Sequence, residues 1–391
     1  MEKYLNQMET NLRILYSEAE LSTCKEAWEE FQKHPNVDWG FFGLINRTRC
    51  LSPCVLELQS GGRTRALWVG RIEERKLPIE LGYFKLGSMR VKQLSILNGG
   101  IMGDDSEDSC RLLLQRALRL LQEHQLDYVA LSYIPSSHVL YRLATREVSS
   151  WFCRDFGVIP NQHWRMILPG SFEEFLKKRS KKHRYWLKRL SRVLEDEFPG
   201  QISMRAFTKP ADVSEFCREA DAVAKLTYQH QLGSAFANNE EYQSRCKLLA
   251  EQGALRGYIL YAKQKPVAYW FATAYRQTLH LNYTGYDPEF RKYEVGTVLL
   301  MKLIEDHCGT SIRDVDFGLG SALYKERFGD ETFNEATVRV YRSSAKALFA
   351  NVVIGGSAKF SAGLKALLVK LGLLQRIKTF WRARMSGGKQ T

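Results

Sequence analysis

The stretch YDPEFRKYEVGTVLL, residues 286–300, constrains the fold more than any other part of this 391-residue chain. An aromatic-rich run at 279–286 has the composition of a strand and ends at Asp287-Pro288, after which a turn-like stretch follows. Gly296-Thr297 then opens an apolar helical pattern. A helix N-terminus that follows a strand and a tight turn attracts phosphate, because its free amides and its dipole both favour negative charge. The stretch therefore predicts an anion site.

Composition indicates a folded cytoplasmic protein. The hydrophobic content of 45% and the charged content of 26% are those of a globular chain, and 391 residues allow two domains. The eight cysteines form no CxxC pair, and no His/Cys cluster has the spacing of a zinc site, so we expect reduced thiols and no metal. The polar first ten residues do not resemble a secretion signal, and no apolar run is long enough to span a membrane.

The net charge of +14 is concentrated near the C-terminus, where residues 336–391 contain eleven Lys/Arg and no acid. Within this part, 357–385 has apolar residues at helical spacing, cationic residues opposite them, and Trp381 near its end. Basic amphipathic helices of this kind lie on anionic membrane surfaces, so we expect peripheral association with the inner face of a membrane. The alternative is that this helix packs against the domain.

The order of predicted elements indicates an α/β (α+β) protein built from two similar halves. Residues 10–168 give strand, helix, several strands, helix and strand, and 202–317 repeat this order. Between them, 171–198 is predicted to be one long helix whose middle carries nine Lys/Arg. One basic helix without interleaved aromatic residues is weak evidence for nucleic-acid binding, so we interpret it as a solvated face and expect no nucleic-acid partner.

Four stretches carry a resemblance to a known family. They are LTYQHQLG (226–233), GYILYAKQKPVAYWFATAY (257–275), YDPEFRKYEVGTVLL (286–300) and DFGLGSALYKERFG (316–329). In order and spacing they resemble the acetyltransferase-like domain of the CelD/BcsL branch of the GNAT superfamily, which is related to the FemABX transferases with two GNAT-like domains in tandem. The resemblance implies two domains with mixed, mostly antiparallel sheets flanked by helices. We place them at 1–168 and 169–350, followed by a basic tail at 351–391.

The resemblance also implies an acyl-CoA loop of the form Q/R-x-x-G-x-G/A. Arg291 and Gly296 fit its ends, whereas Glu294 replaces the first glycine. A carboxylate there would repel a pyrophosphate unless it points away or pairs with Lys292. In the alternative interpretation, the segment is an ordinary strand-to-helix turn in which Gly296 only permits close packing. The residues expected to bind acyl-CoA are Tyr286, Arg291, Lys292, Val295, Gly296 and Thr297.

Tyr324 is the first catalytic candidate. The segment ALYKERFG at 322–329 resembles the superfamily's helix whose tyrosine protonates the departing CoA thiolate, although the final Phe and Gly are in reverse order. A phenol with a pKa near 10 is a reasonable acid for this step. The alternative is a tyrosine that packs in the core with its hydroxyl on a carbonyl.

Asp316 is the second catalytic candidate, because it lies at the end of a buried type of strand beside glycines. It could accept a proton from the acceptor, or it could cap the following loop, and Asp314 is the reserve candidate. His280 in the neighbouring strand is interpreted as structural. The resemblance implies that Tyr228 and Gln229 line the acceptor pocket, and the alternative is a solvated helix edge.

These observations predict an acyl-CoA-dependent N- or O-acyltransferase that acts on a sugar or surface-polymer precursor. A backbone amide in 283–286 would stabilise the oxyanion of the thioester. Two alternatives remain open. One is a FemABX-like transferase that uses aminoacyl-tRNA, and the other is a non-catalytic GNAT-like scaffold in exopolysaccharide synthesis.

Overall fold

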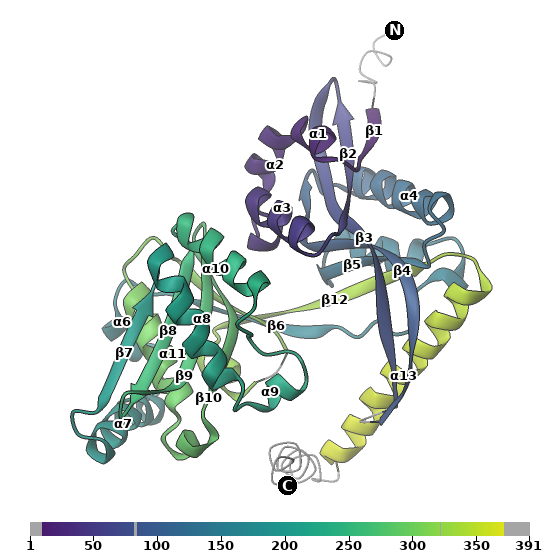
Figure 1. Ribbon diagram of the computed structural model, residues 1–391. Coiled ribbons are helices and arrows are strands. Elements are labelled where there is room, and N and C mark those ends of the chain that lie inside the picture. Colours follow the sequence, from purple (N-terminus) through teal and green to yellow (C-terminus); the bar gives the residue numbers. More distant parts are fainter. Residues whose placement is uncertain (1–9, 82–83, 321, 371–391) are drawn as a thin grey trace. The chain divides into compact units, whose positions relative to one another are not determined.

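The computed structural model describes residues 10–81, 84–320 and 322–370, which form two compact units (Figure 1). Unit 1 contains the residues up to 161 together with 333–370, and unit 2 contains 162–332. This division differs from the expected boundaries, because the segment from 333 to 350 belongs to unit 1. The reason is that its strand pairs with a strand of unit 1.

The sheet of unit 1 has the strand order β1-β2-β3-β4-β5-β12. The strands are β1 (Thr10–Leu15), β2 (Ser52–Ser60), β3 (Arg63–Leu81), β4 (Phe84–Gly103), β5 (Tyr128–Pro135) and β12 (Glu331–Tyr341). Only β4 and β5 run parallel, while the other neighbours within this sheet are antiparallel. The last strand, β12, comes from the chain segment that follows unit 2, and it covers the edge of β5.

The helices of unit 1 bury one apolar side each. They are α1 (Glu18–Ser22), α2 (Lys25–Phe31), α3 (Trp39–Thr48), α4 (Glu107–Glu123), α5 (Val139–Arg142) and α13 (Ala345–Lys370). In α4, for example, Leu113, Ala117 and Leu120 recur at helical spacing and are buried in a core shared with β2 and β5. None of the helices formed by the described residues is long and apolar enough to cross a membrane.

Unit 2 repeats this pattern of strands, with the order β6-β11-β10-β9-β8-β7. The strands are β6 (Asn161–Ile167), β7 (Ile202–Phe207), β8 (Leu255–Ala262), β9 (Lys265–Tyr275), β10 (Thr278–Tyr286) and β11 (Asp314–Leu319). Here β10 and β11 are the parallel pair, and the other neighbours are antiparallel. Each unit is thus a mixed, mostly antiparallel sheet flanked by helices, which confirms the predicted fold class.

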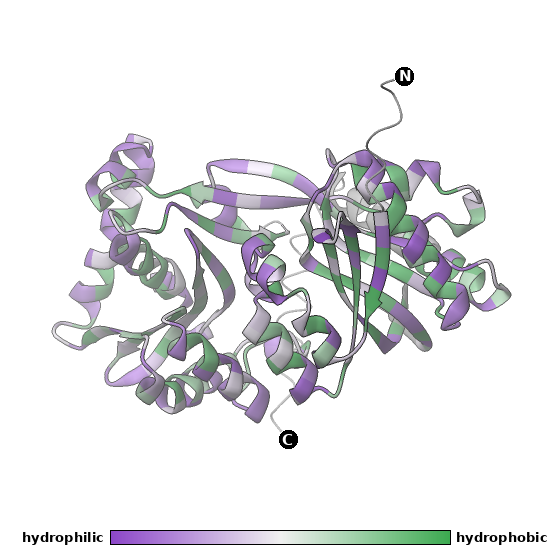
Figure 2. Ribbon diagram, turned by 90° about the horizontal axis from the view of Figure 1, so that it is seen from above, coloured by the Kyte–Doolittle hydropathy of each residue, from purple (hydrophilic) through white to green (hydrophobic). Residues whose placement is uncertain are grey.

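The helices of unit 2 cover both faces of its sheet, and hydrophilic and hydrophobic residues alternate along them (Figure 2). They are α6 (Phe172–Lys177), α7 (Lys181–Glu197), α8 (Val213–Ala224), α9 (Tyr228–Gln231), α10 (Glu240–Glu251), α11 (Val295–His307) and α12 (Leu323–Phe328). In β9, Trp270 packs in a core with α7 and α11, while Tyr269 and Phe271 pack in a second core with α8 and α10. Alternate residues of a strand point to opposite faces, so β9 separates the two cores.

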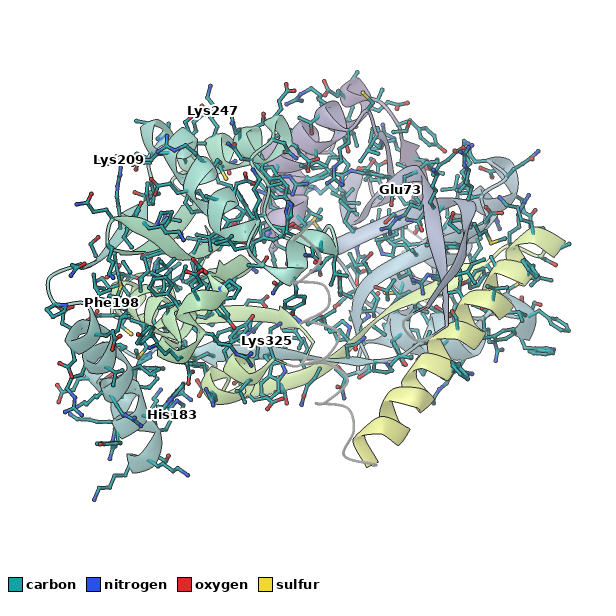
Figure 3. The ribbon with its side chains drawn as sticks, turned by 60° about the horizontal axis from the view of Figure 1, so that its bottom comes forward. Glu73, His183, Phe198, Lys209, Lys247 and Lys325 are labelled. Carbon is teal, nitrogen blue, oxygen red and sulfur yellow. The ribbon has the colours of Figure 1, made fainter. Side chains whose placement is uncertain are left out.

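The single helix predicted at 171–198 is wrong in its middle, because the chain forms two helices there. Ser180 breaks the pattern: its side chain accepts a hydrogen bond from the amide of His183 and caps the start of α7. A serine favours such a cap over a place inside a helix. His183 and Phe198 mark the two ends of α7 in Figure 3.

Candidate active site

The candidate site lies where β10 and β11 separate. Their parallel pairing ends at His280 and Asp316, after which β10 continues to Tyr286 and β11 to Leu319. A cavity of about 590 Å³ lies at the end of β10. Its wall is formed by Thr227, Tyr228, Gln229, Trp270, Thr284, Gly285, Tyr286, Pro288, Arg291, Glu294, Gly296, Thr297, Leu300, Leu323, Tyr324 and Arg327.

The N-terminus of α11 forms one wall of this cavity. After β10, the segment Pro288–Tyr293 makes a short 3-10 helix, and Glu294 follows in the left-handed conformation with φ of 49°. This conformation turns the chain into α11, whose first turn contains no acidic residue and no side-chain cap. The positive end of the helix dipole is therefore not offset by a carboxylate in the first turn.

Gly296 is the second residue of α11 and leaves room beside the cavity. A Cβ atom at this position would contact the Tyr286 ring at 3.6 Å, which is an ordinary van der Waals distance. The indole Nε1 of Trp270 donates to the carbonyl of Gly296 at 3.1 Å and holds this turn against β9. Gly296 thus lines the cavity, although the space beside it would also admit a small side chain.

Glu294 pairs with Arg327, and not with Lys292. The Glu294 Oε2 atom lies 3.2 Å from Nη1 of Arg327, whose guanidinium also lies over the ring of Trp186. Lys292 is 3.9 Å from Glu197 instead. The carboxylate of Glu294 is therefore balanced by Arg327 of α12, which also lines the cavity.

Tyr324 is brought to the cavity by α12. Its ring packs edge-on against Trp270 at 5.5 Å and Phe317 at 6.0 Å between centroids. Burial, with a smaller effect of Tyr228, raises the pKa of Tyr324 to about 12. The phenol is therefore protonated at neutral pH and can donate a proton to an anionic leaving group.

The segments expected on the acceptor side also reach the cavity. Tyr228 and Gln229 lie in its wall at the start of α9. Opposite them, a Cβ atom at Gly285 would come within 2.9 Å of both Tyr269 and Thr227. Only glycine fits there, so the backbone of β10 passes close to the residues before α9.

Asp316 does not line the cavity, although the sequence placed it in the site. Its carboxylate accepts hydrogen bonds from His163 Nε2 at 2.7 Å and from the Gly318 amide at 2.6 Å, and it lies 3.3 Å from His280 Nδ1. Burial raises its pKa, but the hydrogen bonds from the two histidines outweigh burial and hold the pKa well below its usual range. A carboxylate held in this way is a poor proton acceptor, and it caps the turn at Gly318.

Lys325, labelled in Figure 3, fastens α12 to the end of β11. Its Nζ donates to the carbonyls of Gly318 at 3.2 Å and Leu319 at 2.7 Å. Burial lowers the pKa of this amine to about 8. Because Lys325 follows Tyr324 directly, these bonds fix the position of the tyrosine.

The structure brings most of the predicted site residues together and leaves three of them elsewhere. Asp316 contacts His163 and Gly318 outside the cavity, Val295 of α11 is buried in the core, and Lys292 is directed towards Glu197. Among the residues that the structure describes, no group of three or more His, Cys, Asp or Glu side chains could hold a metal ion.

Sequence reasoning missed three functional neighbours of the site. Arg327 and Lys325 lie inside the motif at 322–329, so their nearness to Tyr324 in the chain was a usable signal. His163 gave no such signal, since it is far from Asp316 in the sequence and meets it only through the pairing of β6 with β11.

Comparison with known proteins gives the same fold. Residues 181–326 match the acetyltransferase (GNAT) domain family. The crystal structure of FemX aligns with 87% of this chain and all of its own, with 9% sequence identity and a TM-score of 0.55. A conserved protein of unknown function from Bacteroides thetaiotaomicron VPI-5482 aligns with 84% of this chain and all of its own, with 9% identity and a TM-score of 0.50. Among curated protein sequences, none matches this chain significantly. Unit 2 therefore contains a segment that matches the acetyltransferase (GNAT) domain family, and the chain has a fold similar to that of FemX.

Proposed function

We propose that this protein is an acyl-CoA-dependent N- or O-acyltransferase, and that its acceptor is a sugar or surface-polymer precursor as in the CelD/BcsL-type proteins that the sequence resembles. One observation carries the proposal. Three groups lie in the wall of one cavity: the first turn of α11, which contains no acid and follows the paired N-cap residue Glu294, the guanidinium of Arg291, and the side chain of Tyr324. This combination offers a site for phosphate next to a proton donor.

The residues of the cavity have distinct roles in this proposal. The amides at the start of α11 and Arg291 hold the pyrophosphate, and Glu294 is kept from repelling it by its pair with Arg327. Acyl-CoA supplies the activated thioester carbonyl. An amide at the end of β10 stabilises the oxyanion that forms when the acceptor's nitrogen or oxygen attacks this carbon.

Tyr324 completes the reaction. As the carbon–sulfur bond breaks, its hydroxyl gives a proton to the thiolate, and the proton lost by the acceptor is returned to the phenolate through solvent. Tyr228 and Gln229 position the acceptor on the other side of the cavity. No carboxylate in the wall is required as a base, so an amine acceptor must arrive uncharged.

Titration calorimetry with acetyl-CoA and longer acyl-CoAs tests the donor. Wild type should bind, and Gly296→Glu should weaken binding at least about tenfold, or about 1.4 kcal/mol, because it places a carboxylate at the helix N-terminus. The matched control is Gly87→Glu, which adds the same charge at an open position in unit 1. Failure of wild type to bind any acyl-CoA would refute the proposed function. Equal weakening of binding by Gly87→Glu would contradict the location of the acyl-CoA site at the N-terminus of α11.

An aminoacyl-tRNA donor is the second candidate, and one observation favours it. The exposed face of α7 carries Lys181, Lys182, Lys188, Arg189 and Arg192. If charged tRNA were the donor, binding should fall steeply as salt is raised, since each phosphate contact releases counterions. Binding of tRNA without binding of acyl-CoA would favour the aminoacyl-tRNA-dependent transferase over the acyl-CoA-dependent one. Binding of neither would favour the non-catalytic scaffold.

A further inference from the structure

The long helix α13 of unit 1 has one face packed and one face exposed. On the packed face, Ala347, Ala350 and Ile354 share a core with residues of β3, β4, β5 and β12. Figure 1 shows the helix in yellow along the β3–β4 hairpin, which it contacts. The packed face fixes the orientation of the helix on its unit.

The exposed face of α13 is apolar. Phe349, Val352 and Phe360 are 59%, 57% and 50% exposed, and Gly356 lies between them. Their spacing of three or four residues, repeated, puts all of them on the same side of a helix. Single exposed apolar residues are common, but a row of them along one helix face marks an interaction surface.

An aromatic pair lies beside this helix. Trp151 and Phe152 are stacked with their ring centroids 4.0 Å apart, and more than half of Trp151 is exposed. The fully buried Asn351 ties this segment to α13, because its Nδ2 donates to the carbonyl of Phe152 at 3.0 Å and its Oδ1 accepts from the amide of Phe156. The pair is therefore held next to the helix and is not part of a loose loop.

We infer that this apolar face and the Trp151–Phe152 pair rest on the surface of an anionic lipid bilayer. The charge of the chain decides between a membrane and another apolar partner. Lys359 is exposed on α13, and from residue 336 to residue 391 the sequence contains eleven Lys/Arg and no acid. Apolar side chains enter the interface between head groups and acyl chains, aromatic rings favour that depth, and lysine and arginine bind anionic head groups.

Only the exposed face is available to lipid, because the packed face belongs to the core of unit 1. The helix would therefore lie along the membrane surface and carry the unit with it. This extends the interpretation of segment 357–385, whose part beyond residue 370 lies outside the described residues. The inference does not depend on which donor unit 2 uses.

Flotation of the full chain with phosphatidylcholine vesicles containing 30% phosphatidylglycerol tests the inference. Wild type should float with these vesicles and stay behind with pure phosphatidylcholine. The double variant Phe349→Glu, Val352→Glu should partition about tenfold less, since it replaces two exposed apolar residues by acids. The control is the double variant Leu112→Glu, Leu232→Glu. It introduces the same two negative charges at exposed apolar residues that are not part of the α13 face, and it should float like wild type.

Both variants alter exposed positions, and unchanged thermal melting will show that each is folded. Absence of wild-type flotation, equal flotation with neutral vesicles, or equal loss in both variants would overturn the inference. A wild-type dimer that becomes a monomer in Phe349→Glu, Val352→Glu would also overturn it and would make the face an interface between copies.

Discussion

The two units share a strand pattern but differ at the place where their parallel strands separate. In unit 2 the last parallel pair is His280 and Asp316, whose polar side chains lie 3.3 Å apart, whereas in unit 1 it is Ile96 and Leu131, which are fully buried hydrocarbon. The same point of the fold is polar in one unit and part of the apolar core in the other.

The helices that follow show the same contrast. In α4 of unit 1, Ser106 caps the N-terminus, and Glu107 and Asp108 lie in the first turn. In α11 of unit 2 the first turn contains no acid, and Gly296 occupies the second position, which in α4 belongs to Asp108. The positive end of the dipole thus meets two acids of its own first turn in unit 1, whereas in unit 2 the nearest acid is the N-cap residue Glu294, which pairs with Arg327.

Removal of the Tyr324 hydroxyl should have the largest effect. We expect Tyr324→Phe to lower kcat about 10²–10³-fold, within the range for general acids, with little change in acyl-CoA affinity. Thiol release on mixing with amine and sugar acceptors measures this rate. Tyr141→Phe is the control, because α5 follows β5 in unit 1 as α12 follows β11 in unit 2. An equal loss in both variants would end the functional contrast between the units.

The contact between His280 and Asp316 should stabilise the folded state of unit 2. Asp316→Asn should lower the free energy of unfolding by about 3 kcal/mol, because it removes the carboxylate that contacts the buried His163 and the partly buried His280. The outer pair of Lys302 with Asp306 provides the control, since Asp306→Asn should cost less than about 1 kcal/mol. Urea unfolding at pH 7 measures both, and similar values for the two variants would contradict the role assigned to Asp316.

The stabilisation that Asp316 contributes should depend on pH. The pKa of Asp316 is lower in the folded chain than in the unfolded chain, so the unfolded chain binds more protons near pH 4 and stability rises with pH there. The stabilisation is complete above the unfolded pKa of about 3.9 and is lost as the pH falls towards the folded value. The difference between wild type and Asp316→Asn should therefore narrow as the pH falls below about 4, and a difference that stays constant would argue against an ionised Asp316.

Neutralising Glu294 should strengthen acyl-CoA binding modestly. Glu294→Gln frees Arg327 from its ion pair and removes a negative charge from the cavity, so we expect about threefold tighter binding by calorimetry, or about 0.7 kcal/mol. Glu289→Gln removes an exposed acid from the same turn outside the cavity wall and should have no effect. Weaker binding by Glu294→Gln would mean that the carboxylate itself supports the site.

We expect the smallest effect on stability from a change in the first turn of α4 in unit 1. Asp108→Asn should cost about 0.3–1 kcal/mol of stability, the usual contribution of an acid at a helix N-terminus. It should not create an acyl-CoA site, because buried Ile96 and Leu131 fill the neighbouring corner. Acyl-CoA binding that increases in this variant would show that unit 1 retains a second site.

Local patterns in the sequence predicted much of the fold but fewer of the contacts in the site. Apolar spacing located α11, and the turn at Asp287-Pro288 located the end of β10, since both depend on near neighbours. The partners of Glu294 and Asp316 come from distant segments, and no pattern in one sequence ranks Arg327 above Lys292. The break at Ser180 was missed because a capping serine and a surface serine are alike without structural context.

The origin of β12 has a consequence for biosynthesis. Pro135 pairs with Glu335, and two hundred residues separate them in the chain. At a synthesis rate of about 5–20 residues per second, the edge of β5 waits roughly 10–40 s on the ribosome for its neighbour. An uncovered strand edge invites pairing with other chains, so the first unit depends on the completion of the second for protection during translation.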